Sequence, residues 1–312
     1  MKLAPPALMA AAAALLLAAF PTLAAPGAAV CDQQLTRSIP ARAEGSLTGS
    51  QFADRARNLA GPERDALVRS ELAAGDVPGF LRHLEPVTLH GAGAEVTVCV
   101  LPDYLAVGSD RDFEYVPMGL EAALEVAGRY GFVLPTRKLV NAIYEQSTVK
   151  LTPQPLPAGD QMRSTAYLVH HNQMIGEQRA ARGASLGELT AGHKKDLVLT
   201  PRLWQVPGRV AIYGWHRDVG APIQPLSTVH GARYADYSHG IRLVSEVVYV
   251  NGVRRLMAEV LADPRLAALL SDEGPLPQLA ERLGSLLGGL RTAASQPTVA
   301  FVPAPRGLPS VL

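Results

Sequence analysis

Histidine is concentrated in one part of the chain. Six of the eight histidines lie between His170 and His239, and several of them stand beside lysine, arginine, tyrosine or aspartate. An imidazole changes its charge near neutral pH, and it is a typical general acid or base when phenols, amines and carboxylates surround it. The concentration of these residue types therefore favours one shared site of proton-transfer chemistry.

Three short segments that contain glycine carry most of these histidines. They read Gly-His-Lys-Lys-Asp at 192–196, Ile-Tyr-Gly-Trp-His at 212–216 and Asp-Tyr-Ser-His-Gly-Ile-Arg-Leu at 236–243, with His230 shortly before the last one. Glycine and polar residues between apolar runs predict loops at strand ends, where a scaffold usually carries its functional residues. We therefore predict that these loops converge on one cleft.

The candidate residues divide into two predicted roles. We expect the side chains that transfer protons or complete the catalytic group to be His239, Tyr237, His216, His193 and Asp236. We expect the side chains that contact the substrate to be Arg242, Lys195, Trp215, Arg217 and Ser238. In this scheme the positive charges hold an anionic group of the substrate, and the indole supplies a stacking face.

Two other mechanisms use the same residues. Zinc would be held by His230 and His239 together with His216 or Asp236, although the chain contains no HExxH motif. A nucleophile at Ser238 would lack the GxSxG turn that exposes such a hydroxyl. The sequence therefore predicts chemistry without a cofactor, and a zinc site that includes His230 is the alternative.

Each segment also has a purely structural interpretation. A histidine beside glycine commonly bonds within its own loop, Lys194 and Lys195 would be solvated charges, and Trp215 would be a partly buried aromatic residue. An enzyme needs the histidines around one cleft, whereas a binding module spreads polar and aromatic groups over a shallow surface. The arrangement in space therefore separates the two interpretations.

The elements that must position these segments predict an α+β fold. We expect a helical N-terminal part packed on a mixed or antiparallel sheet, with loops carrying the histidines. Helical spacing, proline starts and glycine ends predict helices at 50–57, 62–74, 117–129, from 135 onward, and at 162–182, 264–270 and 276–290. Alternating or continuous apolar runs predict strands at 87–90, 95–101, 104–107, 113–116, 196–200, 209–213 and 243–250.

The first 25 residues have the pattern of a secretory signal peptide. Lys2 supplies the positive charge, Leu8 to Phe20 is an apolar run, and small residues precede Pro26. A permanent membrane anchor needs about 20 apolar residues, and this apolar run is shorter. We therefore expect a secreted or periplasmic protein without a stable membrane anchor.

The mature chain is expected to form one globular domain over 26–292. A proline-rich stretch near 152–160 would permit a subdivision, and residues 293–312 have the composition of an extended or disordered tail. An oxidising compartment favours pairing of the two cysteines, Cys31 and Cys99. The formal net charge is +1, so the protein has no strong overall positive field that would attract nucleic acid. Oligomeric state is not indicated.

Two resemblances are carried by the segment Ser238–Leu243. It resembles the Ser-His-Gly-Cys-Ile/Val-Arg signature of L,D-transpeptidases, with His230 and Gly231 in place of the upstream His-Gly of that family. The nucleophilic cysteine has no counterpart, because Gly240 is followed directly by Ile241. Together with the segments at 192–196 and 212–216, the stretch also resembles uncharacterised exported bacterial proteins, which implies no reaction.

These observations together predict an exported enzyme. We expect a hydrolase that cleaves an extracellular or cell-envelope polymer, a glycan or peptidoglycan, by acid-base chemistry centred on histidine and tyrosine. The alternatives are a polysaccharide lyase, a zinc-dependent hydrolase and a non-catalytic module that binds a glycan or the cell wall. The expected partner in each case is an extracellular or envelope glycan or peptide polymer.

Overall fold

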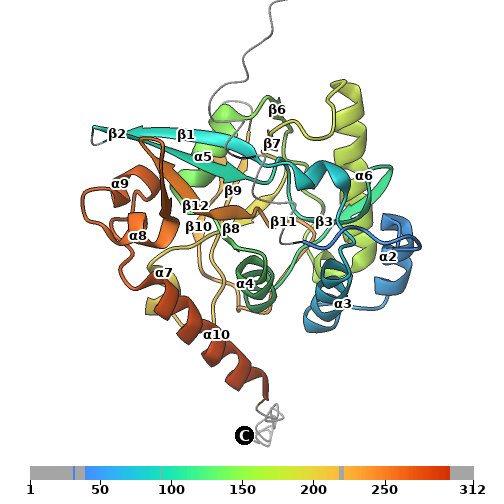
Figure 1. Cartoon of the computed structure of the whole chain (residues 1–312). Helices are drawn as coiled ribbons and strands as arrows, with labels where there is room; N and C mark the ends of the chain where they lie inside the picture. The colour runs from blue at the N-terminus through green and yellow to red at the C-terminus, as the bar shows by residue number, and fades with distance from the viewer. Residues whose placement is uncertain (1–30, 32–38, 92, 218–220, 296–312) are drawn as a thin grey trace, which may run out of the picture.

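The computed structural model describes residues 31, 39–91, 93–217 and 221–295 (Figure 1). Helices and mostly antiparallel sheets alternate along the chain, which confirms the α+β fold class. The predicted signal peptide and residues 296–312 of the predicted tail lie outside the described residues. Residues 293–295 of that tail are the end of α10 (Leu279–Ser295). No helix in the described part of the chain combines the length and apolar character that crossing a bilayer requires.

Two predicted helices open the described chain. The first, α2 (Gly49–Ala56), begins with a capping box in which Thr48 and Gln51 bond each other's backbone amides. The second, α3 (Pro62–Ala73), begins with proline and has two acidic residues in its first turn, an arrangement that suits a helix N-terminus. Both helices lie with α6 (Thr165–Ala181) on the right side of the molecule in Figure 1.

The larger sheet has the strand order β1-β2-β12-β13, with β5 also paired to β12. All of its pairs are antiparallel, and Asn251 and Gly252, both with positive φ, form the turn between β12 and β13. Apolar residues dominate β2 and β12, because these central strands are largely buried. The strands are β1 (Glu85–Gly91), β2 (Ala94–Val100), β5 (Phe132–Val133), β12 (Val244–Val250) and β13 (Val253–Leu256).

The smaller sheet, with the order β10-β9-β8-β11, contains the histidine segments. Its β8–β11 pair is parallel and its other pairs are antiparallel, so the sheet is mixed. Trp215 and His216, which we expected in a loop, end β9, because pairing with β10 holds them in the ladder. His239 likewise lies in β11 opposite Lys195. The strands are β8 (Lys195–Leu197), β9 (Ile212–His216), β10 (Pro222–Ser227) and β11 (His239–Gly240).

Short strands and helices complete the fold. The remaining strand pairs are β3 (Ala106–Ser109) with β4 (Asp112–Tyr115) and β6 (Val149–Lys150) with β7 (Thr190–Ala191). The remaining helices are η2 (Gly79–Arg82), α4 (Leu120–Arg129), α5 (Arg137–Gln146), η3 (Asp160–Arg163), α7 (Arg202–Gln205), α8 (Met257–Ala262) and α9 (Ala267–Leu270). Side chains from both sides of the stretch 152–160, such as Leu139 and Ile212, enter one hydrophobic core.

A disulfide joins Cys31 to Cys99 of β2, as the cysteine pair predicted. The two Cα atoms are 5.4 Å apart, and the sequence separation is 68 residues. Both cysteines are buried in the core. The bridge therefore ties the start of the described chain to a central strand of the larger sheet.

The bridge should contribute measurably to stability. Cys31→Ala leaves Cys99 as a buried thiol and should lower the free energy of unfolding by about 4 kcal/mol, because the unfolded chain loses a long cross-link. Urea unfolding of the parent and the variant measures the difference, and chemical reduction of the parent serves as a control that should bring the two together. A loss below about 1 kcal/mol would contradict the expected role of the bridge.

Candidate functional site

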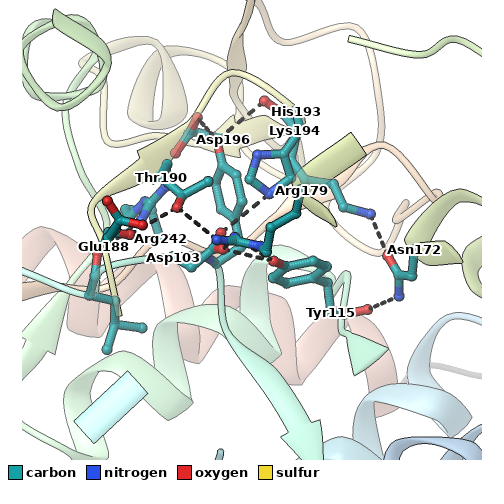
Figure 2. Close-up of polar contacts among 12 residues, drawn as sticks. Asp103, Tyr115, Asn172, Arg179, Glu188, Thr190, His193, Lys194, Asp196 and Arg242 are labelled. Atoms are coloured by element: carbon teal, nitrogen blue, oxygen red, sulfur yellow. Dashed lines mark hydrogen bonds and ion pairs between the residues drawn. The ribbon is translucent and has the colours of Figure 1, made fainter. Parts of the chain in front are cut away.

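Six ionisable side chains are buried together around the start of β8, and we call them the buried charge network. Figure 2 shows them converging from loops, α6 and β8. None is more than one-tenth exposed. Charged groups are rarely buried unless they are paired and hydrogen-bonded, so each one must have partners here. The members are Asp103, Arg179, His193, Lys194, Asp196 and Arg242.

Asp103 lies at the centre of the network. Arg179 pairs with its Oδ2 atom, His193 Nε2 is 3.2 Å from its Oδ1 atom, and the Tyr115 hydroxyl donates to Oδ2 over 2.7 Å (Figure 2). Burial alone would raise the pKa of Asp103, but the His193 and Arg179 partners and the Arg242 charge outweigh it and lower the pKa. The carboxylate is therefore ionised, and it holds three segments of the chain together.

Lys194 has an environment unlike the solvated one that its sequence neighbours suggest. Its Nζ atom donates to Asn172 Oδ1 over 3.0 Å, to the Tyr237 carbonyl over 2.7 Å and to His171 Nδ1 over 3.1 Å. These partners use all three donors of an ammonium group. Burial lowers the pKa of Lys194 to about 7 against the opposing charge of Glu114.

Arg242 was expected to contact the substrate, but it is fully buried. Its guanidinium donates to the carbonyls of Leu101 over 2.8 Å and Thr190 over 2.5 Å, and it lies 4.3 Å from the centre of the Tyr104 ring. The Tyr104 hydroxyl in turn donates to Asp196 Oδ2 over 2.9 Å. Arg242 therefore ties backbone segments together in this conformation and offers no surface to a ligand.

A second group lies on the other side of β8, and we call it the His239 cluster. It consists of Lys195, His230, Tyr234, Asp236 and His239. The cluster is held against the network through backbone bonds, because the Lys195 amide donates to the Ser238 carbonyl and Lys194 binds the Tyr237 carbonyl. The buried charge network therefore sets the position of the Asp236–Gly240 segment.

Asp236 organises the His239 cluster. Its Oδ1 atom accepts hydrogen bonds from the Ser238 amide over 2.8 Å and the Ser238 hydroxyl over 2.6 Å, and its Oδ2 atom accepts one from Tyr234 over 3.0 Å. Burial opposes ionisation, but the charge that His239 carries when it is protonated, the Ser238 bonds and the Lys195 charge lower the pKa of Asp236. The group is therefore a fixed carboxylate, with Oδ2 3.9 Å from His239 Nε2.

His239 is buried, and neither of its ring nitrogens has a hydrogen-bond partner among the described residues. Burial is the main cause that lowers its pKa to about 4, and the Lys195 charge acts in the same direction. The imidazole is therefore neutral at neutral pH. A neutral imidazole with an unbonded nitrogen is able to accept a proton.

The outer part of the cluster is partly exposed. His230 stacks on Tyr234 with ring centres 4.1 Å apart, and the Tyr234 ring lies edge-on to His239 at 5.7 Å. Lys195 Nζ is 4.7 Å from the centre of the Trp215 ring. Lys195, His230 and Tyr234 are each half-buried. The stacked pair and the ammonium therefore form the partly exposed portion of the cluster.

Other predicted catalytic residues have different surroundings. His193 belongs to the buried charge network, whereas His216 stacks on Tyr144 at 4.5 Å and its Nε2 atom is 3.0 Å from Asn141 Oδ1. The Tyr237 hydroxyl accepts a hydrogen bond of 2.7 Å from the Leu156 amide. The sequence segments therefore meet around β8, but only part of the predicted set belongs to the His239 cluster.

The other residues that we expected to contact the substrate have the following surroundings. Trp215 is 5% exposed, donates from Nε1 to the His193 carbonyl over 3.0 Å and has a positive φ of 58°. The Ser238 hydroxyl is buried against Asp236. Arg217 is exposed, and its carbonyl accepts a hydrogen bond from Tyr144. Of the predicted contacts, Lys195 is the one that belongs to the His239 cluster.

Sequence reasoning missed several members of these groups. Asp103 and Arg179 are far from the histidine segments along the chain, and no local pattern links them. Tyr234 precedes Asp236 by only two residues, so a predicted turn at this point could have indicated that the two side chains pair. Within the described residues, no three His, Cys, Asp or Glu side chains are grouped as metal ligands, and His230 instead stacks on Tyr234.

Comparison of the chain with protein-family models, curated proteins and solved structures gives no match.

The Tyr237 hydroxyl should be structural rather than chemical. Tyr237→Phe removes a partner of the Leu156 amide and should lower the free energy of unfolding by about 1 to 3 kcal/mol. Urea unfolding measures this loss. Tyr167→Phe is the matched control and should cost less, because its hydroxyl bonds to the exposed Pro157 carbonyl. If the stability of Tyr237→Phe is unchanged, the Tyr237 hydroxyl is again a candidate for proton transfer in the reaction.

Asp196 should make stability depend on pH. Burial outweighs the Arg242 charge and the Tyr104 hydrogen bond and raises the pKa of Asp196 from 3.8 to about 7. Between these values the folded protein keeps a proton that the unfolded chain releases, so this contribution to stability is present at low pH and lost as pH rises toward about 7.

The matching variant is Asp196→Asn, which keeps an acceptor for Tyr104 but does not titrate. Unfolding free energies of parent and variant, measured across the range from about pH 4 to about pH 7, should shift in favour of the variant as pH rises. A difference that stays constant across this range would show that Asp196 is ionised in the folded protein.

Proposed function

We propose that the protein is an exported hydrolase of an extracellular or cell-envelope polymer, a glycan or peptidoglycan, with the His239 cluster as its active site. One observation carries the proposal. The His239 imidazole is neutral and unbonded, and it lies beside the fixed carboxylate of Asp236 and edge-on to the partly exposed Tyr234 ring. Perturbed titratable groups of this kind are enriched at catalytic sites.

In this proposal His239 is the general base. It takes a proton from the water that attacks the scissile bond, and Asp236 stabilises the imidazolium that forms, at a separation of 3.9 Å between Oδ2 and Nε2. The imidazolium then returns this proton to the leaving group as the scissile bond breaks. Lys195 stabilises the negative charge that develops on the oxygen of the substrate, because its partly buried ammonium acts in a region of low dielectric constant. Tyr234 orients the carboxylate through its hydrogen bond to Oδ2.

Substrate must reach His239, which is 1% exposed. The Tyr234 ring lies edge-on to it and His230 stacks on that ring, and side chains at binding surfaces commonly change rotamer when a ligand arrives. The proposal therefore requires that the stacked pair shift on substrate binding. The Asp236 carboxylate stays fixed during this shift through its two bonds from Ser238.

Export is supported by two independent features. Residues 1–25 have the signal-peptide pattern, and the Cys31–Cys99 disulfide suits an oxidising compartment. The disulfide also uses both cysteines of the chain, so no thiol is left for chemistry of the L,D-transpeptidase kind. Ser238 is not proposed as a nucleophile, because its hydroxyl donates to Asp236 and is buried.

A non-catalytic glycan-binding module is the second candidate. It is favoured by the burial of Asp236, Ser238 and His239, which together form a well-bonded turn. Such a module would not use Trp215 as its stacking face, because that ring is buried and covered by Lys195. The polysaccharide lyase alternative would likewise have to use Lys195, since Arg242 is held by backbone carbonyls.

Substitution of His239 tests the proposal. His239→Ala should reduce turnover of peptidoglycan, neutral glycans or uronate-containing glycans about a hundredfold to ten-thousandfold, because it removes the general base. Turnover by the parent should fall as pH drops below about 4, where the His239 imidazole becomes protonated. Initial rates on purified substrates measure both effects, and circular dichroism verifies that the variant folds.

His216→Gln is the matched control, because it changes a buried histidine outside the cluster and should leave turnover near the parent rate. Treatment with a chelator runs in parallel, and loss of activity there would favour the zinc alternative. Turnover of a substrate at the parent rate by His239→Ala would refute the assignment of this site.

A further inference from the structure

We infer that the site recognises a glycan through negatively charged groups repeated along it. The inference rests on the proposed function and names its substrate class. It is carried by three cations around the stacked pair of His230 and Tyr234, which we call the basic rim. The members of the basic rim are Arg163, Lys195 and Arg209.

The basic rim comes from three separate parts of the chain. Arg209 donates from Nη1 to the Val229 carbonyl over 2.6 Å, which holds it next to His230. Arg163 ends η3, where the carbonyl of the preceding Met162 accepts a hydrogen bond from the Tyr237 amide over 3.0 Å, and its charge acts on Tyr234. Lys195 lies in β8 opposite His239 of β11, and its charge acts on His230. The fold therefore gathers three cations that are distant along the sequence.

These cations lack compensating carboxylates. None of the three forms an ion pair with a carboxylate among the described residues, although Asp236 lies within electrostatic range of Lys195. Asp236 is itself occupied by hydrogen bonds from Ser238 and Tyr234. A concave or partly buried region with surplus charge of one sign attracts ligands of the other sign.

A second observation lies directly behind the basic rim. Arg64 is fully buried and donates from Nη1 to the Arg163 carbonyl over 3.0 Å, but its Nε and Nη2 atoms have no partner among the described residues. Its charge reaches Asp236. Burial of a guanidinium with two unpaired nitrogens is costly, and a nearby anion reduces that cost.

The remaining surface suits sugar rings rather than a bare ion. The stacked His230 and Tyr234 rings are partly exposed, and Val229 beside them is 70% exposed. Aromatic and aliphatic side chains of this kind contact the apolar faces of sugars, while the rim charges bind oxyanions. A glycan that carries carboxylates or phosphates can contact the aromatic and aliphatic side chains and also pair with the cations of the basic rim. A neutral glycan can make only the first kind of contact.

Binding measurements test the inference without requiring turnover. The parent should bind polygalacturonate more tightly than neutral dextran of similar length, and added salt should weaken that binding because the rim is exposed to solvent. Arg163→Gln and Arg209→Gln should each weaken it about 2- to 5-fold, the size expected for exposed charge pairs. Arg255→Gln on β13, an exposed arginine in the other sheet, is the matched control and should bind as the parent does.

The outcomes separate this inference from the proposed function. Binding to a phosphate-bearing glycan alone would support the inference and identify phosphate as the oxyanion. Binding of dextran as tight as that of the anionic glycans, no binding of any anionic glycan, or parent-like binding by both rim variants would overturn it. Charge-dependent binding without turnover of any glycan would leave the inference intact and refute the hydrolase.

Discussion

The pairing of Asp103 with Arg179 and His193 is the constraint on which the rest of the structure depends. A carboxylate is stable in a protein interior only when cations and hydrogen-bond donors meet it there. Its partners come from α6 and from the segment that leads into β8. Because Lys194 follows His193 directly and binds the Tyr237 carbonyl, the same pairing fixes how β8 lies against the Asp236–Gly240 segment.

The two sides of β8 consequently have different roles. On one side, buried polar and charged groups are held by ion pairs and hydrogen bonds and act as structural cross-links, as Arg242 does with two backbone carbonyls. On the other side, His239 is buried without a hydrogen-bond partner among the described residues, and Asp236 is held in place by Ser238. Burial thus produces a rigid support in one place and a neutral, available base in the other.

The α+β class, the early helices and the disulfide could be predicted, because periodicity, capping residues and a cysteine pair are local signals. The sequence predicted only part of the way in which the histidine segments converge on β8. Trp215 and His239 turned out to lie in strands, since glycine near a polar residue does not reveal how strands pair. Burial of Lys194 and Arg242 was beyond the sequence, because lysine and arginine are usually solvated and their partners Asn172 and Leu101 are distant along the chain.

The role of His239 as a neutral base is tested most directly by measuring the protonation state of its imidazole in the folded protein. Nitrogen-15 NMR of histidine-labelled protein, with His239→Gln used to assign the signal, follows the two ring nitrogens as pH is lowered. We expect a neutral imidazole that gains its proton near pH 4. An imidazole already protonated at neutral pH, paired with Asp236 as a permanent cation, would contradict it, because such a group has no free site to accept a proton from water.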